Sequence, residues 1–400
     1  MEYISKYLLF IVALILTNSC TDEKTEDFKE VKATISLKLG DYTGTLSNPL
    51  IIKFTNLSGG FGQVFEKRVY KIEDIKLENL VPGQYIISVT GKLTQDEAME
   101  IYGKQSSYVL NANLSNVEIY DYTEGKPIVV NIEESMESFL IFKEMYYCGS
   151  KTDSNSNYLY DKFFEIYNNS EEVIYLDSVC LANASHSGQV DYDFGEAAKD
   201  NLFSNEVWMI PGTGKDVPLE PGKSIVIAIS ATNHTTALSR LDLTSSDYET
   251  YVEKTSGTPL DYPATNMIAI YKTTTTKFWS LAYGGNGMIL YKLDYPFDPN
   301  DIVLPSNALG STKASVKIPK KAVLDAVDCI ADESKYLDKK FPASIDAGFA
   351  TVGAGWIAKS VARKIKETTP EGRIIFQDTN NSSEDFEVMD TPQIRRYLNN

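Results

Sequence analysis

The sequence predicts an all-β protein built from two β-sandwich domains. From residue 31 onward, short runs of apolar or alternating residues recur along the chain, and Gly, Asn, Asp and Pro separate them. Regularly spaced short strands of this kind are typical of sandwiches. The chain has 400 residues, which suggests roughly two or three domains, each able to bury a core of its own.

The composition argues against several classes of function. With 38 basic and 55 acidic residues the net charge is −17, whereas nucleic-acid binding needs clustered Lys and Arg to neutralise phosphates. We therefore expect no nucleic-acid partner. The chain has 2 histidines, and most zinc sites and most acid–base catalysis use His. An enzyme here would have to work with carboxylates, Ser, Lys or Cys.

The first 19 residues are similar to a lipoprotein signal peptide. The unbroken apolar run Leu8 to Leu16 is too short to span a bilayer, which takes about 20 residues, but it fits the apolar region of a secretory signal. Cys20 follows Thr17-Asn18-Ser19, and this arrangement resembles a bacterial lipobox. The resemblance implies acyl chains on Cys20 that bind outer-membrane lipid. The alternative is a plain secreted protein in which Cys20 has no role.

Residues 20–30 predict an acidic tether. The stretch Thr21 to Asp27 contains no apolar residue, so it has nothing to pack into a core. Similar acidic runs at this position resemble the signal that sends Bacteroidetes lipoproteins to the outer face of the outer membrane. We expect a lipid-anchored protein exposed on the cell surface. The alternative is that the run is only a spacer.

Residues 31–133 are expected to form the first sandwich. The run Val31 to Leu39 alternates strictly between apolar and polar residues, as a half-buried strand does. Further strands are predicted at Leu50–Thr55, Arg68–Ile72, Gln84–Leu93, Ser107–Ile119 and Ile128–Ile132.

A Pro-Gly pair marks one turn of this domain. Pro82 fixes φ for the first turn position, Gly83 is expected to take the positive φ of the second, and an alternating strand follows from Gln84. The segment resembles the hairpin of prealbumin-like and carboxypeptidase-regulatory-like modules, which are non-catalytic spacers in surface proteins. The resemblance implies an immunoglobulin/prealbumin-like sandwich.

Residues 139–400 are expected to form a second β domain, after a polar linker at residues 133–138. The strand Phe163-Phe-Glu-Ile-Tyr-Asn168 ends in a polar turn, and the chain returns through Ile174 and Leu176. This pattern resembles the lamin-tail domain, an immunoglobulin-like sandwich. A second Pro-Gly turn, Pro221-Gly222, leads into the apolar run Ile225–Ile229, which predicts a strand buried on both faces.

The whole layout resembles the Bacteroidetes surface lipoproteins of the domain-of-unknown-function 4876 family. That resemblance implies a signal peptide, a prealbumin-like module and a lamin-tail-like domain enlarged by an insertion, here about Ala184 to Pro342; it implies no reaction. Because long insertions on a sandwich commonly carry binding surfaces, we expect the ligand-facing surface there. Within it Trp208 is expected in the core, and Trp279 is the candidate for an exposed aromatic ligand contact.

The polar motifs favour no metal, cofactor or catalytic site. Two loops, Asp153 to Asn157 and Asp378 to Glu384, begin like calcium loops but lack the later Gly and Glu, so Asx turns are expected. Both histidines, His186 and His234, lie in polar loop sequence, and the chain has no G-x-S-x-G motif. We therefore assign no catalytic, cofactor-binding or metal-binding residue.

Beyond Cys20 the chain contains Cys148, Cys180 and Cys329. Three cysteines without regular spacing allow at most one disulfide, so a disulfide-stapled scaffold is excluded. Cys180 lies in an apolar run and is expected to be a buried strand residue that behaves as a small hydrophobe.

Two functions remain open. The first is a non-catalytic, lipid-anchored surface protein that binds an extracellular ligand or docks on a neighbour such as a TonB-dependent transporter. The second is a carboxylate-based glycan hydrolase, which needs two Asp or Glu carboxylates about 5–9.5 Å apart in one cleft. With 55 acidic residues, the sequence alone leaves such a pair open.

Overall fold

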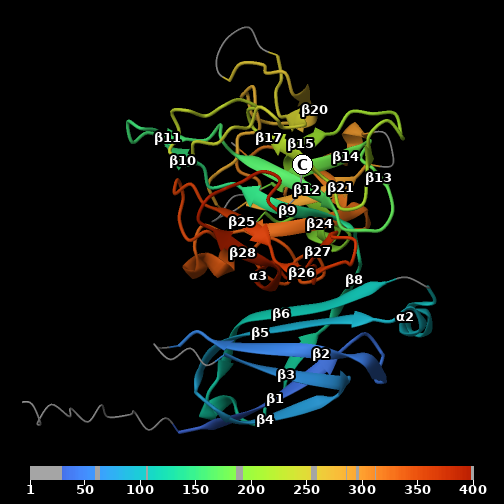
Figure 1. The fold of residues 1–400 in the computed structure, drawn as a ribbon. Coiled ribbons are helices and arrows are strands. Elements are labelled where there is room, and N and C mark those ends of the chain that lie inside the picture. The colour runs from blue at the N-terminus through green and yellow to red at the C-terminus, as the bar shows by residue number, and fades with distance from the viewer. Residues whose placement is uncertain are drawn as a thin grey trace, which may run out of the picture.

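The computed structural model describes residues 29–58, 64–104, 107–185, 192–253, 259–284, 286–293, 297–310 and 312–397. Within these ranges the chain is almost entirely β-structure, and two sandwiches follow one another along it (Figure 1). The all-β prediction is confirmed. Cys20, the predicted signal peptide and His186 lie outside the described residues. None of the described helices is long and apolar enough to cross a membrane.

The N-terminal sandwich is made of two sheets. The smaller sheet has the strand order β4–β1–β7, in which β1 and β7 run parallel, and the larger sheet has the order β3–β2–β5–β6–β8. The bounds are β1 Val31–Lys38, β2 Thr45–Asn56, β3 Val64–Lys71, β4 Asp74–Leu80, β5 Gly83–Leu93, β6 Tyr108–Ile119, β7 Ile128–Asn131 and β8 Glu133–Met136, with one helix, α2 Gln95–Tyr102, and one 3₁₀ turn, η1 Asp121–Thr123.

Strand alternation builds the core of this sandwich. Ile52 and Phe54 on β2 and Ile87 on β5 are fully buried between the sheets. The residues between them, such as Lys53 and Ser88, point to the opposite face of the large sheet. That outer face lies toward the C-terminal sandwich, with β5 and β6 nearest to it in Figure 1.

Each of the two Pro-Gly turns needs its glycine for a different reason. Gly222 has φ +74°, as predicted for the second position of such a turn. The same expectation for Gly83 is wrong, because Gly83 is not among the residues with positive φ. A Cβ at Gly83 would instead lie 2.5 Å from Oδ1 of Asn56, so this glycine permits a close approach between β5 and β2.

The C-terminal sandwich is made of two larger sheets. One has the order β19–β18–β17–β12–β9–β25–β28, and the other has β22–β23–β15–β14–β21–β24 with β20 paired to β15. The bounds are β9 Leu140–Tyr146, β12 Phe163–Asn168, β14 Val179–Ala184, β15 Asn201–Met209, β17 Ser224–Ala228, β18 Tyr248–Glu249, β19 Thr265–Asn266, β20 Ile268–Lys272, β21 Asn286–Lys292, β22 Ile302–Val303, β23 Ser315–Pro319, β24 Val323–Cys329, β25 Ser360–Arg363 and β28 Phe386–Met389.

Short elements connect and cover these sheets. Three two-stranded ladders are formed by β10 with β11, β13 with β16, and β26 with β27. Their bounds, with those of the remaining helical turns, are β10 Ser150–Lys151, β11 Asn157–Tyr158, β13 Ile174–Tyr175, β16 Pro218–Leu219, β26 Ile365–Thr368, β27 Ile374–Phe376, η2 Gly195–Lys199, η3 Pro299–Asp301, η4 Lys320–Ala322, η5 Glu333–Asp338 and α3 Ser382–Asp385.

The segment predicted as an insertion, 184–342, belongs to the core. It supplies β17, which pairs with β12 in the first sheet, and β15 and β21, which flank β14 in the second. The segment is therefore not an addition to a complete sandwich, because its strands are part of both sheets. The predicted linker at 133–138 is likewise partly a strand, because β8 pairs with β6.

Both tryptophans of this segment are buried. Trp208 has 0% of its surface exposed, as predicted. Trp279 is 1% exposed, so the prediction of an exposed aromatic contact is wrong. Its ring packs 5.4 Å from that of Phe164, and its indole N–H donates to Oδ1 of Asn183 at 2.9 Å. The polar run before Trp279 suggested a surface position, but the buried acceptor satisfies the indole and allows burial.

The polar residues of the β12 motif, Glu165 and Asn168, have structural roles. Glu165 is buried and accepts from Nζ of Lys143 on β9 at 2.8 Å. Asn168 closes the turn after β12: its Nδ2 donates to the carbonyl oxygens of Glu172 and Leu219 at 2.7 and 2.8 Å. These contacts explain why a strand that is otherwise apolar carries an acid and an amide.

Candidate functional site

A cleft lies between the two sandwiches. It has a volume of about 670 Å³ and is lined by the outer face of the five-stranded sheet on one side. On the other side it is lined by residues of the segments 333–351 and 381–388 of the C-terminal sandwich. Its size is in the range of ordinary ligand pockets, roughly 300–1,000 Å³, and a boundary between domains is a common place for them.

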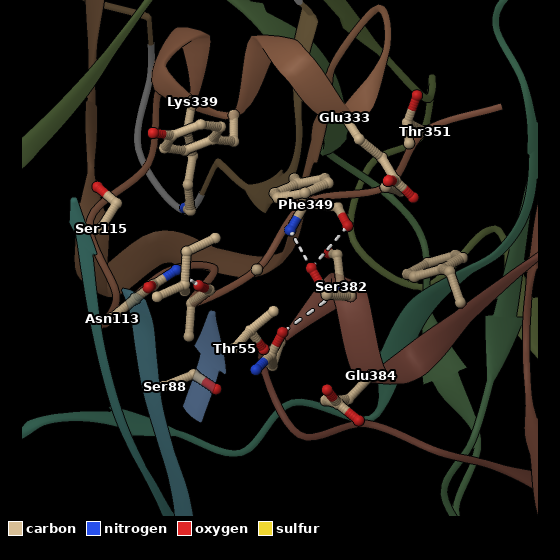
Figure 2. Close-up of a pocket in the computed structure, with 18 of the residues that line it drawn as sticks. Thr55, Ser88, Asn113, Ser115, Glu333, Lys339, Phe349, Thr351, Ser382 and Glu384 are labelled. Carbon is tan, nitrogen blue, oxygen red and sulfur yellow. Dashed lines mark hydrogen bonds between the residues drawn. The ribbon is translucent and has the colours of Figure 1, made fainter. Parts of the chain in front are cut away.

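The N-terminal wall of the cleft is mostly polar. Lys53 on β2, Ser88 on β5 and Asn113 on β6 stand side by side across three neighbouring strands. Thr55 and Ser115 lie near this row on the same wall, and Figure 2 shows the labelled side chains together. They occupy the positions that alternate with the apolar core residues, which is why the strand pattern leaves them free to face the cleft.

The opposite wall is built around the short helix α3. Asp346 fixes it, because its two carboxylate oxygens accept from the backbone N–H and the hydroxyl of Ser382 at 2.9 and 2.7 Å. Gly348 passes so close that a Cβ there would lie 2.1 Å from Oδ1 of Asn381 and 2.5 Å from the backbone N of Ser383. A side chain at position 348 would therefore displace Asn381 or Ser383.

Polar contacts join the two sandwiches beside the cleft. Lys53 forms an ion pair with Glu384, and Nδ2 of Asn113 donates to the carbonyl oxygen of Ala347. The hydroxyl of Tyr336 donates to Oδ1 of Asn116 at 2.7 Å. Such a boundary, held by polar contacts with a hollow beside them, resembles a binding interface more than a continuous core.

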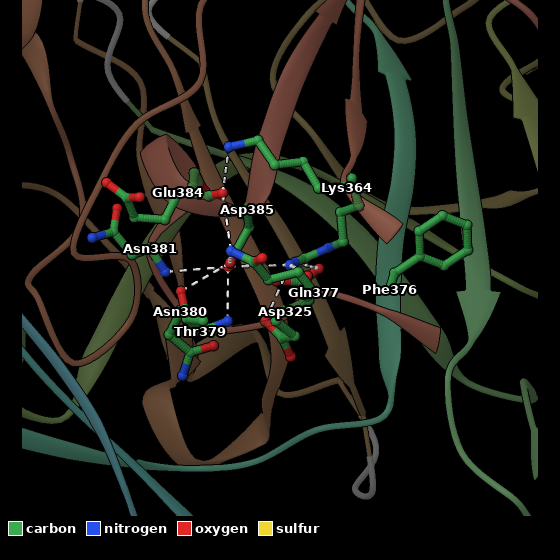
Figure 3. Close-up of polar contacts among 12 residues, drawn as sticks. Asp325, Lys364, Phe376, Gln377, Thr379, Asn380, Asn381, Glu384 and Asp385 are labelled. Carbon is green, nitrogen blue, oxygen red and sulfur yellow. Dashed lines mark hydrogen bonds and ion pairs between the residues drawn. The ribbon is translucent and has the colours of Figure 1, made fainter. Parts of the chain in front are cut away.

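A buried charge cluster lies beneath α3. Arg363 on β25 donates to Oδ2 of Asp325 at 2.7 Å, to Oδ1 of Asp378 at 3.1 Å and to Oδ2 of Asp385 at 3.3 Å. Asp385 also accepts from the backbone N–H of Thr379 at 2.8 Å (Figure 3). The cluster therefore connects β25 and β24 to the helix that lines the cleft.

Burial controls the protonation of this cluster. Burial raises the pKa of Asp385 to about 7 and that of Asp325 to about 6, although Arg363 opposes both shifts. Both side chains are almost fully hidden from solvent, at 1% and 5% exposed. Both carboxylates face Arg363 and are buried, so they do not form the accessible pair that a glycan hydrolase needs.

The predicted calcium-like loops are occupied by other contacts. Asp378 binds Arg363, as described above, and Asp153 forms an ion pair with Arg240. His234, predicted in a polar loop, is 1% exposed, and its ring nitrogens contact the hydroxyl of Tyr158 at 2.9 Å and the carbonyl oxygen of Ser230 at 3.0 Å. It therefore closes a turn and lies away from the cleft.

The described residues include no group of three or more His, Cys, Asp or Glu side chains that could hold a metal ion. Cys148, Cys180 and Cys329 are all buried and free. Cys180 lies in β14, as predicted for a small hydrophobe in a strand.

Sequence reasoning missed the cleft. Its residues come from three strands of one domain and from two distant segments of the other, and only the docking of the sandwiches brings them together. One signal was available: Ser88 and Thr55 place hydroxyls on a sheet face that a lone sandwich would expose to water. That pattern does not distinguish a binding surface from an ordinary solvated one.

Known proteins resemble this chain in sequence and in structure. The family model "Protein of unknown function (DUF4876)" matches residues 220–393, all within the C-terminal sandwich. A solved DUF4876 family protein from Bacteroides thetaiotaomicron VPI-5482 aligns over 92% of this chain and 97% of its own, with 28% identity and a TM-score of 0.61. No curated protein matches the chain. The structural likeness thus extends over both sandwiches.

Proposed function

We propose that the chain, which is similar to the DUF4876 family over residues 220–393, is a non-catalytic, lipid-anchored surface protein that binds a ligand in the cleft between its sandwiches. Acyl chains on Cys20 hold it in the outer membrane in this proposal, and two or more chains would anchor it stably. The protein would be accessory to an outer-membrane transporter, such as a TonB-dependent transporter, to which it presents the ligand.

The observation that carries this proposal is the cleft itself. A hollow of about 670 Å³, with polar side chains from both sandwiches on its walls, is a feature that neither hydrophobic core requires. Concave sites that combine apolar surface with a few polar groups are the usual form of ligand pockets.

The arrangement of carboxylates favours binding over hydrolysis. Glu384 lines the cleft but is paired with Lys53. Glu333 lies apart from Glu384 in Figure 2, and the third carboxylate of the cleft, Glu387, is exposed on β28. The carboxylates of Asp325 and Asp385, which contact Arg363, are buried. A glycan hydrolase needs an accessible pair, so the binding function fits the geometry better.

The position of β1 suits a surface anchor. β1 lies in the sheet of the N-terminal sandwich that is remote from the cleft, and the acidic run predicted as a tether precedes it in the sequence (Figure 1). A tether attached there leaves the cleft and the C-terminal sandwich facing away from the membrane.

The anchor is tested by Cys20→Ala. This variant should appear in the soluble fraction of cells, whereas the unmodified chain should fractionate with the outer membrane and be cleaved by protease added to intact cells. Equal membrane fractionation of both forms would contradict the role of Cys20.

The cleft is tested by filling it. Ser88→Trp places a large ring on the N-terminal wall, and Arg68→Trp is the matched control, because Arg68 is exposed on β3 of the same sheet outside the cleft. Native membranes from each strain are solubilised and the protein is purified with whatever it retains. We expect Ser88→Trp alone to lose the retained molecule. Equal retention by both variants would show that the cleft is not the binding site.

A further inference from the structure

The cleft offers unused hydrogen-bonding groups. The hydroxyls of Thr55, Ser88 and Ser115 on the N-terminal wall form no hydrogen bond with another described residue. Oδ1 of Asn113 is buried and has no partner among the described residues, although its Nδ2 is used. A buried acceptor without a partner is costly, so this wall is suited to a ligand that can donate and accept hydrogen bonds.

The cationic groups of the cleft are already neutralised. Lys53 and Lys339 are the basic side chains among the described residues that line it. Lys53 is paired with Glu384, and Nζ of Lys339 contacts Oδ2 of Asp328 at 3.3 Å and the carbonyl oxygen of Phe341 at 2.8 Å.

The charge that remains in the cleft is negative. The carboxylates of Glu333 and Glu387 line it and are exposed, and the whole chain carries a net charge of −17. An anionic ligand would be repelled at close range and would find no free cation to pair with. Phosphorylated, sulfated and strongly acidic ligands are therefore disfavoured.

Two of the aromatic rings that line the cleft are partly accessible. Phe349 and Tyr336 are half-buried and line the cleft from the C-terminal side. The hydroxyl of Tyr336 is held by Asn116 across the boundary, so that ring is fixed in place. In Figure 2 Phe349 lies across the hollow from Ser88 and Asn113. A rigid apolar face opposite a row of hydroxyl and amide groups fits a ring with C–H faces and hydroxyl edges.

We infer that the cleft binds a neutral, polyhydroxylated ligand, namely a stretch of uncharged oligosaccharide. Its ring faces pack on Phe349 and Tyr336, and its hydroxyls bond to Ser88, Asn113 and the neighbouring wall. This inference rests on the proposed function and names the ligand class for the same site.

The test measures binding directly. The detergent-solubilised full-length protein is titrated calorimetrically with neutral hexasaccharides of glucose, mannose and xylose in α and β linkage. A sulfated hexasaccharide and an extended uncharged peptide serve as comparators. We expect at least one neutral hexasaccharide to bind, and its sulfated counterpart to bind at least tenfold more weakly.

Two variants locate the binding. Phe349→Ala should weaken the binding at least tenfold. Ser88→Ala should weaken it about three- to tenfold. Because Ser88→Ala should leave the fold undisturbed, it keeps the test valid if Phe349→Ala disturbs the fold. The control is Tyr70→Ala, because Tyr70 is a 52% exposed aromatic of the same sheet outside the cleft. The affinity of this variant for the neutral sugar should be unchanged.

Several results would overturn the inference. These are equal or tighter binding of the sulfated sugar, binding of the peptide alone, binding that Phe349→Ala and Ser88→Ala both leave intact, or no binding by any neutral sugar. If no neutral sugar binds but Ser88→Trp still abolishes retention in native membranes, the ligand class is wrong and the proposed function stands. If Ser88→Trp changes nothing, the proposed function itself fails.

Discussion

The two sandwiches share an architecture of two packed sheets but differ in the polarity of their interiors. The N-terminal core is almost wholly apolar, and few polar residues are buried there, among them Asn56 and Glu97. The C-terminal sandwich buries several ion pairs, including Lys143 with Glu165 at 2.8 Å, and the Arg363 cluster. Burying charges costs several kcal/mol per ion unless each is paired and hydrogen-bonded, so the second interior depends on complete polar networks in a way that the first does not.

The largest expected effect follows from removing the central charge of the C-terminal sandwich. Arg363→Met keeps much of the volume but leaves the carboxylates of Asp325 and Asp385 buried without their cation. The free energy of unfolding of this domain should fall by about 3–5 kcal/mol. Denaturant unfolding followed by circular dichroism measures it.

The matched control for that variant is Lys366→Met, because Lys366 is an exposed cation on the neighbouring strand β26. Its effect should stay within about 0.5 kcal/mol. If both variants lose the same stability, the buried network is not what distinguishes this sandwich from its neighbour.

A second expected effect is that the free energy of unfolding depends on pH. The folded pKa of Asp385 is raised to about 7 from an ordinary value of 3.8. Between these values the folded protein holds a proton that the unfolded chain has released, so the free energy of unfolding decreases as pH rises from about 4 to about 7. This direction is opposite to that of an exposed, ion-paired carboxylate.

Asp385→Asn isolates that contribution, because other buried groups titrate in the same range. His234 acts in the opposite direction, since burial lowers its pKa. The difference in stability between unmodified protein and Asp385→Asn should change by roughly 1–3 kcal/mol between pH 5 and pH 7.5. A difference that does not vary with pH would contradict the raised pKa.

A smaller effect is expected in the N-terminal sandwich. Thr94 caps α2: its hydroxyl accepts from the backbone N–H of Glu97, and Glu97 accepts in return from the backbone N–H of Thr94 at 2.7 Å. Thr94→Ala should lower the free energy of unfolding of this domain by about 1 kcal/mol. The exposed neighbour Gln95→Ala is the control and should have little effect; equal losses would mean that the cap is not formed.

The comparison also explains what the sequence could predict. In the N-terminal sandwich the strand expected at Gln84–Leu93 matches β5 closely, because an apolar interior imposes a clean alternation. The strand expected at Leu50–Thr55 is the second half of β2, which begins at Thr45. Helix α2 was missed even though Thr94 and Glu97 have the spacing of a capping box. The helix is only eight residues long, and its apolar face is too short to show a helical period.

The C-terminal sandwich was harder to predict for a physical reason. A buried polar residue that is satisfied by a distant partner looks like a surface residue in the sequence. The run of threonines before Trp279 suggests a surface position, whereas Thr274 and Thr276 form a partly buried network with Lys272 and Glu206. The cleft had no sequence signature for a similar reason: its two walls are far apart in the chain.

The smallest expected effect is that of metal removal. Asp378 and Asp153 begin the two calcium-like loops. Each forms an ion pair with an arginine, Arg363 and Arg240 respectively, so the charge of both carboxylates is already neutralised. EDTA should leave the melting temperature of both sandwiches unchanged. A drop of several degrees that calcium restores would show that one of the loops binds metal.

The measurement that tests the central claim most directly is hydrogen–deuterium exchange of the protein with and without the molecule it retains from native membranes. If the cleft is the binding site, backbone amides should be protected in β2, β5 and β6 and in the segments 333–351 and 381–388, the walls that line it. Amides of β20, at the far end of the C-terminal sandwich, should be unaffected (Figure 1). Protection confined to that far end, with none on the cleft walls, would contradict the account.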